Sequence, residues 1–435
     1  ALVGFTELDR QPAYMDDTAA AGADTLPLGV VVGQTGSGKT MLMLRLAEQW
    51  ARMRNRAGEL KPVIVIDPKQ GSDHSEAAAR VGAQVFSLDE LSESDGVFDP
   101  IRFSASRTSG VQTAHSLLMT VNPWGTRRLD FETPLLQALA YGVEKGATCT
   151  GQALEIAAQD RVNEYAGAIL EGVKAQSSSP TFRALCGFDP VGTGLRVSEG
   201  LTYIRVGTAD FELPDENVPA SQVDRITQRT CLALVRAMVY GSSQALMGRQ
   251  GVLLMDEGWV CLSSGRADCE RLGRLARSQD FFPVFFTQRV TDLTNAGLAG
   301  FISRGVILPI TDPAEARAAL ELFRVEVTQE RMDRIRGGAT IGGDDRVDGS
   351  PNWSSMRALR DPVTREILRG TIGLYCDTAG RAVPVEITLP GDFLAAASTN
   401  PDDQAARRAR RPVPVGAVSA PEEPVAADPW GPSTW

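Results

Sequence analysis

Residues 33–40 read Gly-Gln-Thr-Gly-Ser-Gly-Lys-Thr and fit the pattern GxxxxGK[ST] in full. The apolar run before them, 26–32 (LPLGVVV), predicts a short buried strand. After them, residues 39–56 carry apolar side chains at helical spacing and stop before Gly58. A glycine-rich turn between a strand and a helix lets successive backbone N–H groups point at an anion, so this stretch predicts a phosphate-binding loop.

The residue types in this loop indicate a nucleoside triphosphate. Lys39 is expected to reach the β- and γ-phosphates, and Thr40 to offer its hydroxyl to Mg²⁺. The helix that begins here presents the positive end of its dipole to the same phosphates. We therefore predict that the chain binds ATP and Mg²⁺, and a plain flexible glycine turn is disfavoured by the flanking strand and helix. The predicted nucleotide contacts are Gly33, Gln34, Thr35, Gly36, Ser37, Gly38, Lys39, Thr40, Met41 and Asp67.

Asp67 and Lys69 stand at the end of a second apolar strand, 63–66. In a parallel sheet this end lies near the phosphate-binding loop. The two side chains could contact the nucleotide or a neighbouring subunit, and a plain turn is an equally good interpretation.

Two carboxylates follow a further apolar strand. Residues 252–255 (VLLM) predict a strand buried on both faces, and Asp256 and Glu257 come directly after it. Ligands of open parallel sheets bind outside the carboxyl ends of the strands, so these side chains should face the phosphates. Asp256 is expected to hold Mg²⁺ through water, and Glu257 to orient and deprotonate the attacking water.

Gln288 ends another apolar strand, 283–287. Its amide both donates and accepts hydrogen bonds, so it could sense the γ-phosphate or position the attacking water. A polar residue that is merely satisfied at a strand end fits the pattern equally well.

Three arginines recur at three-residue spacing on one predicted helix, 269–278: Arg271, Arg274 and Arg277. A solvated basic face is one interpretation. The other is an arginine finger that reaches into an adjacent subunit's site, where such a group raises the rate by roughly 10³ to 10⁵.

The order of predicted elements is that of an α/β protein, with a βαβ unit over 26–66 after a polar lead-in, 1–25. We predict a RecA-like P-loop NTPase core with a mainly parallel sheet, plus a mainly α-helical insertion domain. The predicted parts are 1–124, the first part of the core with the P-loop; 125–248, the helical insertion; 249–390, the second part of the core with a C-terminal hairpin of 370–376 and 381–388; and 391–435, a disordered tail rich in Pro, Ala and Arg.

The insertion is predicted to contain three helices. Thr133 is expected to be the N-cap of the first, with Pro134 at its first helical position. A stripe of apolar residues predicts one continuous helix over 152–175, and the third covers 221–246. Residues 201–206 read as a strand.

Composition narrows the function classes. The 435 residues are 43% hydrophobic and 23% charged, as is typical of a globular protein. A formal net charge of -10 argues against a protein that coats nucleic acid or anionic lipid over a broad basic face. The net charge does not exclude a small basic groove. Six scattered cysteines and two histidines, His74 and His115, give no zinc-site spacing. No apolar stretch is long enough to span a bilayer, so any membrane association would be peripheral.

The two ends of the chain carry separate expectations. The first residue is Ala1 rather than Met, which we expect to mark a fragment of a longer protein. In the tail, the basic run 407–411 could touch nucleic acid or acidic lipid, or could be solvated with no binding duty.

The motifs together resemble one family. The quoted elements are IDPK at 66–69, LLMDEGW at 253–259 and RLARSQDFFPVFFTQ at 274–288. With the P-loop they look like the carboxy-terminal ATPase half of the VirB-four/TraC class, the traffic ATPases of type IV secretion and conjugation systems in the HerA/FtsK branch of P-loop motors. The resemblance covers roughly residues 5–390. Gly258 followed by Trp259 is a mild departure from the family pattern that leaves the carboxylates in place.

The resemblance implies roles for single residues. It makes Lys39 and Thr40 the Walker A pair, and it makes Asp256 and Glu257 the Walker B pair. Gln288 becomes the residue after the sensor strand. Arg277 matches the arginine of the family's Arg-Lys pair, but Ser278 replaces the lysine, so the choice between Arg274 and Arg277 as the finger stays open.

The implied function is an ATP-hydrolysing motor of conjugation-type secretion, hexameric at least when working, with nucleotide between neighbouring subunits. The implied partners are further copies of the chain and proteins of the secretion channel or membrane complex. Whether DNA is also a partner is left open. The implied location is cytoplasmic and peripheral at the inner face of the cell membrane.

Other functions fit parts of the pattern. A DNA-pumping translocase or coupling protein of the same superfamily would share every site residue. A scaffold that nucleotide merely stabilises is the non-enzymatic alternative. A small-molecule kinase is the least favoured, because it needs an acceptor pocket and gives no reason for the long helical insertion.

Overall fold

One sheet organises the molecule. The computed structural model describes residues 1–17, 28–68, 75–80, 82–87, 95–206, 211–214, 218, 222–258, 272, 276, 278–295, 297–341, 350–364 and 366–397. Within these residues, an 11-stranded sheet has the order β2-β1-β13-β12-β9-β3-β8-β7-β4-β6-β5. Its strands are β1 (Leu2–Thr6), β2 (Pro12–Tyr14), β3 (Leu28–Val32), β4 (Val63–Asp67), β5 (Gln84–Ser87), β6 (Leu201–Arg205), β7 (Val252–Met255), β8 (Phe282–Thr287), β9 (Ile302–Ile307), β12 (Ile372–Asp377) and β13 (Ala382–Glu386).

Every neighbouring pair from β9 through β3, β8, β7, β4 and β6 to β5 is parallel. The central strands are apolar and buried on both faces, as parallel strands require. Successive side chains enter two separate cores: Ile64 and Ile66 join one cluster, and Val63 and Val65 join the other. The predicted α/β class with a mainly parallel sheet is confirmed.

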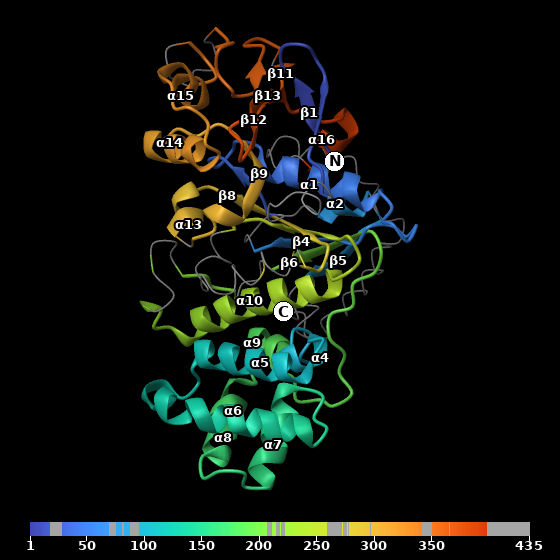
Figure 1. Ribbon diagram of the computed structural model, residues 1–435, viewed down its shortest axis with the longest axis vertical. Helices are drawn as coiled ribbons and strands as arrows, with labels where there is room; N and C mark the ends of the chain where they lie inside the picture. Colours follow the sequence, from blue (N-terminus) through green and yellow to red (C-terminus); the bar gives the residue numbers. More distant parts are fainter. Residues whose placement is uncertain are drawn as a thin grey trace, which may run out of the picture. The chain divides into compact units, whose positions relative to one another are not determined.

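Helices cover both faces of this sheet (Figure 1). The helix α1 (Lys39–Ala51) follows β3 and packs Leu42, Leu46 and Trp50 into one core. The prediction of a helix to residue 56 was wrong at its end. Arg52 is the C-cap, and the chain then turns back on itself, with a bridge between Arg54 and Leu60 and a φ of 85° at Gly58.

A helical layer lies beyond the opposite face. Its helices are α4 (Pro100–Phe103), α5 (Arg107–Val121), α6 (Arg128–Glu144), α7 (Thr150–Gln159), α8 (Ala166–Gln176), α9 (Pro180–Leu185) and α10 (Ile226–Leu246). The cap at Thr133 was wrong, because α6 begins at Arg128 and holds Pro134 in its interior. Phe131 explains the earlier start, since its ring packs between Trp124 and Tyr165.

The single helix over 152–175 was also wrong. The chain leaves the helix after α7, at Arg161 with a φ of 52°, and begins again at α8. The predicted insertion limits of 125–248 are crossed by the sheet, because β6 pairs in parallel with both β4 and β5. The residues of β6 are almost wholly buried. Beyond it, α10 packs against α5 and α9 of the helical layer and also against β7 and β4, so this helix joins the layer to the sheet.

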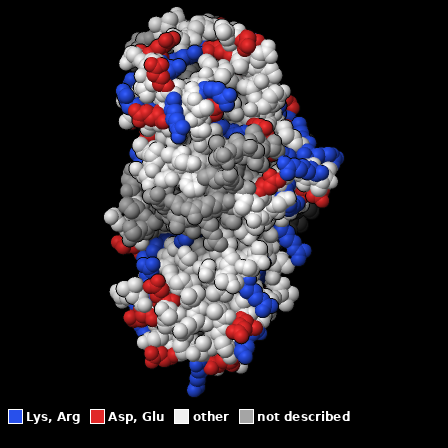
Figure 2. Space-filling model, in the orientation of Figure 1, with Lys and Arg blue, Asp and Glu red and all other residues white. Residues whose placement is uncertain are grey.

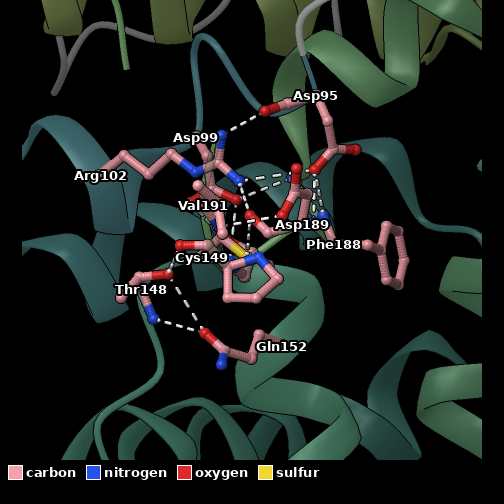
Figure 3. A network of polar contacts seen from close by, with 12 residues as sticks. Asp95, Asp99, Arg102, Thr148, Cys149, Gln152, Phe188, Asp189 and Val191 are labelled. Carbon is pink, nitrogen blue, oxygen red and sulfur yellow. Dashed lines mark hydrogen bonds and ion pairs between the residues drawn. The ribbon is translucent and has the colours of Figure 1, made fainter. Parts of the chain in front are cut away.

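Asp99 joins the ends of three helical segments (Figure 3). It caps α4 by accepting the N–H of Ile101 at 2.9 Å. The same carboxylate accepts the N–H and hydroxyl of Thr150 at the start of α7, both at 2.8 Å, and the N–H of Gly187 after α9 at 2.9 Å. Burial raises the pKa of Asp99, and the hydrogen bonds act against that shift.

The other end of the sheet is antiparallel. The predicted hairpin is confirmed as β12 and β13, and β12 pairs with β9 at the edge of the parallel part. The stretch described as a polar lead-in forms β1 and β2, and β1 pairs with β13. The remaining elements here are α13 (Val290–Asn295), α14 (Pro313–Leu322), α15 (Gln329–Arg336), β10 (Leu359–Arg360), β11 (Ile367–Arg369) and α16 (Gly391–Ala397). Across the described part of the chain, no helix combines the length and apolar character that crossing a membrane needs.

Candidate nucleotide site

The loop between β3 and α1 adopts a backbone that its glycines permit. Gly36 and Gly38 have φ values of 77° and 92°, with open space where a side chain would stand. A Cβ on Gly33 would lie 2.6 Å from Ser37 Oγ and 2.7 Å from Leu308 Cβ, so only glycine fits there. The sequence therefore builds an open nest of N–H groups at the end of a buried strand.

Lys39 lies inside this nest rather than in solvent. Its side chain is buried, and Nζ donates to the carbonyl oxygens of Gly33 at 2.6 Å and Gln34 at 3.0 Å. These contacts hold the ammonium group over the loop, where phosphates would lie. Thr35 and Gly36 at the tip of the loop are exposed.

Asp256 stands at the carboxyl end of β7, next to the loop. Thr40 Oγ1 donates to Asp256 Oδ2 at 3.1 Å, and the N–H of Glu257 donates to Asp256 Oδ1 at 3.0 Å. Burial, with added repulsion from Asp67 and Glu257, raises the pKa of Asp256 to about 6. The two side chains expected at the metal are thus already paired.

Gln288 connects the two motifs. Its Nε2 donates to Glu257 Oε1 at 3.1 Å, and its Oε1 accepts the hydroxyl of Thr35 at 2.7 Å. Glu257 itself has a φ of 46°, and the N–H of Gly258 donates to Phe286 O at 2.8 Å. The neighbouring strands β7 and β8 therefore aim a carboxylate and an amide at the tip of the phosphate-binding loop.

Asp67 lies below the site and is fully buried. Tyr203 on β6 donates its hydroxyl to Asp67 Oδ2 at 2.6 Å. Burial and the carboxylate of Asp67 raise the pKa of Tyr203. Asp67 is the last residue of β4, so a plain turn does not describe it. Sequence reasoning missed Tyr203, because one hydroxyl in an apolar strand carries no signal before β6 is placed beside β4.

The remaining predicted residues divide into two groups. Met41, on α1, is half-buried against the core that contains α1, and Ser37 is buried under the loop. Other predicted residues lie outside the described residues: Lys69, His74, Trp259, Arg271, Arg274, Arg277 and the basic run 407–411.

A glycine-built phosphate nest, its lysine, and acidic and amide side chains at the carboxyl ends of parallel strands define a P-loop ATPase. The chain belongs to the AAA-like domain family, whose model matches residues 16–397. The resemblance to the VirB-four/TraC class is confirmed at the level of the fold.

A solved structure gives the same fold. VirB4 of Thermoanaerobacter pseudethanolicus is 12% identical, with a TM-score of 0.59 over 90% of this chain and 97% of that chain. The plasmid coupling protein TrwB in complex with ADP and Mg²⁺ is 16% identical, with a TM-score of 0.45 over 87% of this chain and 91% of that chain. No curated protein sequence matches the chain.

Proposed function

We propose that the chain is the ATP-hydrolysing motor of a type IV secretion or conjugation system. The observation that carries ATP hydrolysis is the hydrogen-bonded path from Thr35 through Gln288 to Glu257, and the likeness of the fold to VirB4 supports the secretion role. This path puts a base and an amide where water would meet a terminal phosphate. A site that only bound nucleotide would have no need of it.

The residues next to Thr40 fit Mg²⁺. Thr40 and Asp256 offer oxygen atoms 3.1 Å apart, and oxygen is the ligand type that Mg²⁺ takes. Among the residues that the structure describes, no cluster of three His, Cys, Asp or Glu side chains could hold a metal. Mg²⁺ commonly takes one or two side chains together with substrate phosphates. When bound, Mg²⁺ would neutralise charge on the phosphate oxygens.

Hydrolysis is in-line attack of water on the γ-phosphorus. Gln288 orients the water, and Glu257 accepts its proton as the new P–O bond forms. Lys39 and the N–H groups of the loop neutralise the charge that develops as the bond to ADP breaks. The products are ADP and inorganic phosphate.

The exposed tip of the loop supports a shared site. Thr35 and Gly36 face solvent, which leaves room for a cation from a neighbouring subunit. We extend the proposal to a homo-oligomer, a hexamer when working, with Arg274 or Arg277 as the finger. Partner proteins of the secretion channel would keep it at the cytoplasmic side of the membrane. On the face drawn in Figure 2, basic and acidic side chains are interspersed, which favours moving or assembling protein over coating DNA.

Glu257→Gln tests the role of the base. The variant should bind ATP with unchanged affinity, because the amide keeps the shape of the side chain, and should lose about 10²-fold or more in kcat, because no base remains. The measurement is steady-state phosphate release beside nucleotide titration. The matched control is Glu326→Gln, an exposed carboxylate on the same chain. Normal turnover in Glu257→Gln would remove Glu257 from this role.

Mass measurement with and without ATP tests the shared site. The assembly should grow when ATP is present, and the rate of phosphate release per subunit should rise with protein concentration. Assays with and without DNA separate the secretion motor from a DNA-pumping translocase. Only the translocase should hydrolyse ATP faster when DNA is added, and its DNA binding should weaken as the salt concentration rises. A strict monomer with full activity contradicts the shared site.

A further inference from the structure

The segment after β9 holds the second residue of the phosphate-binding loop. The N–H of Gln34 donates to Pro309 O at 3.1 Å. The side chain of Gln34 accepts the N–H of Thr311 through Oε1 at 2.7 Å, and the hydroxyl of Thr311 donates to the same oxygen. Gln34 is therefore fixed at its backbone and at its side chain.

Two arginines from elsewhere in the chain converge on Thr311. Arg336, the last residue of α15, donates from Nε to Thr311 O at 3.1 Å. Arg357, which precedes β10, donates from Nη2 to Thr311 Oγ1 at 3.2 Å. A continuous path of hydrogen bonds thus runs from Arg357 through the hydroxyl of Thr311 to Gln34.

These arginines differ from their neighbours in charge pairing. Arg334 and Arg369 pair with Glu7, and Arg331 pairs with Glu326. For Arg336 and Arg357, no carboxylate of the described chain lies within ion-pair distance.

The guanidinium of Arg357 is partly desolvated. Its Nε is buried and has no hydrogen-bond partner among the residues that the structure describes. Two positive charges therefore stand beside the phosphate-binding loop, and a buried N–H without an acceptor is costly until an anion or water satisfies it.

We propose that Arg336 and Arg357 are positioning residues that the C-terminal segment supplies to the nucleotide site of its own subunit. Through Thr311 they fix Gln34 and so the entry of the loop, and their charge favours a triphosphate over a diphosphate. This role rests on ATP being the substrate. It is separate from that of the finger, which comes from another subunit.

The test compares ATP and ADP on the same variants. Arg336→Gln and Arg357→Gln should each lower the affinity for ATP about five- to tenfold and the affinity for ADP less than about twofold, because the charge acts mainly on the third phosphate. KM should rise more than kcat falls. The matched control is Arg317→Gln on α14, which removes an exposed arginine and should leave both nucleotides unchanged.

Two further variants separate charge from geometry. Arg357→Lys keeps the charge and should keep the ATP-to-ADP affinity ratio of the wild type. Thr311→Val keeps both arginines but loses the hydroxyl between Arg357 and Gln34, so kcat should fall while the ratio stays. If one Gln variant fails to fold, the other decides, because each removes one of the two charges.

The outcomes are distinguishable. An unchanged ATP-to-ADP ratio in folded Gln variants, a loss no larger than in Arg317→Gln, or a ratio lost in Arg357→Lys overturns the proposal. Wild-type protein that binds neither nucleotide refutes the ATPase function itself and not the arginines.

Discussion

Asp256 lies where a charge is costly. Its carboxylate is buried, and the nearby acidic side chains of Asp67 and Glu257 add repulsion, so its pKa is raised from 3.8 to about 6. Between these two values the folded protein holds a proton that the unfolded chain has released. Stability therefore falls as pH rises through this window, and the whole cost is present above pH 6.

Asp256→Asn should stabilise the nucleotide-free protein at neutral pH. We expect the free energy of unfolding at pH 7.5 to rise by about 1–3 kcal/mol, because the variant has no charge to bury. The gain should shrink as pH falls and vanish near pH 4, where the wild type is protonated as well. Urea unfolding at a series of pH values measures it, with the exposed Asp333→Asn as the control. A gain that does not vary with pH would show that the charge is not its cause.

At the scale of elements, Asp99 holds three segments of the helical layer together. One carboxylate serves the starts of α4 and α7 and the turn after α9. No apolar contact can replace it, because the groups that it satisfies are backbone N–H donors. The stability of the helical layer should therefore depend strongly on the side chain of Asp99.

Asp99→Ala should cost about 3 kcal/mol or more in the free energy of unfolding, because it leaves two buried N–H groups and one part-buried N–H group without an acceptor. Asp189→Ala is the matched control, since Asp189 is exposed and its side chain satisfies only the N–H of Val191 nearby. That control should change stability by no more than about 0.5 kcal/mol. Equal losses of stability in the two variants would mean that the hydrogen bonds of Asp99 do not stabilise the fold more than those of an exposed carboxylate.

For the whole molecule, the antiparallel extension protects the parallel core. β12 pairs with β9 along four residues, and β13 and β1 continue the sheet outward. Without β12, the backbone of β9 would be an open edge that can pair with other chains.

A chain that ends at residue 397 keeps every described element and should unfold cooperatively with unchanged ATPase activity. A chain that ends at residue 369 loses β12 and β13 and should aggregate. Size-exclusion chromatography with circular dichroism measures both, and the first truncation controls for the second. A soluble, active chain ending at 369 would show that the extension is dispensable.

Sequence patterns predicted the elements whose signals are local. The strands β3 and β7 are apolar runs, β4 and β8 are apolar up to their last residue, and the loop 33–40 carries its glycines, lysine and threonine in one stretch. The strands β1 and β2 escaped prediction because they are short, and the pairing of β1 with β13 spans nearly the whole described chain. The start of α6 and the break after α7 escaped because aromatic packing and a left-handed residue outweigh the proline and the apolar stripe.

The sequence by itself determined the phosphate-binding loop, the carboxylates after β7 and the α/β class, since each depends on neighbours along the chain. Only the tertiary structure decided that Tyr203 would hold Asp67 and that Gln288 would join Thr35 to Glu257. It also brought Arg336 and Arg357 to Thr311. These residues come from strands and loops far apart in the chain. Their meeting depends on strand order and register, which arise from the packing of the whole sheet and leave no mark in any single stretch.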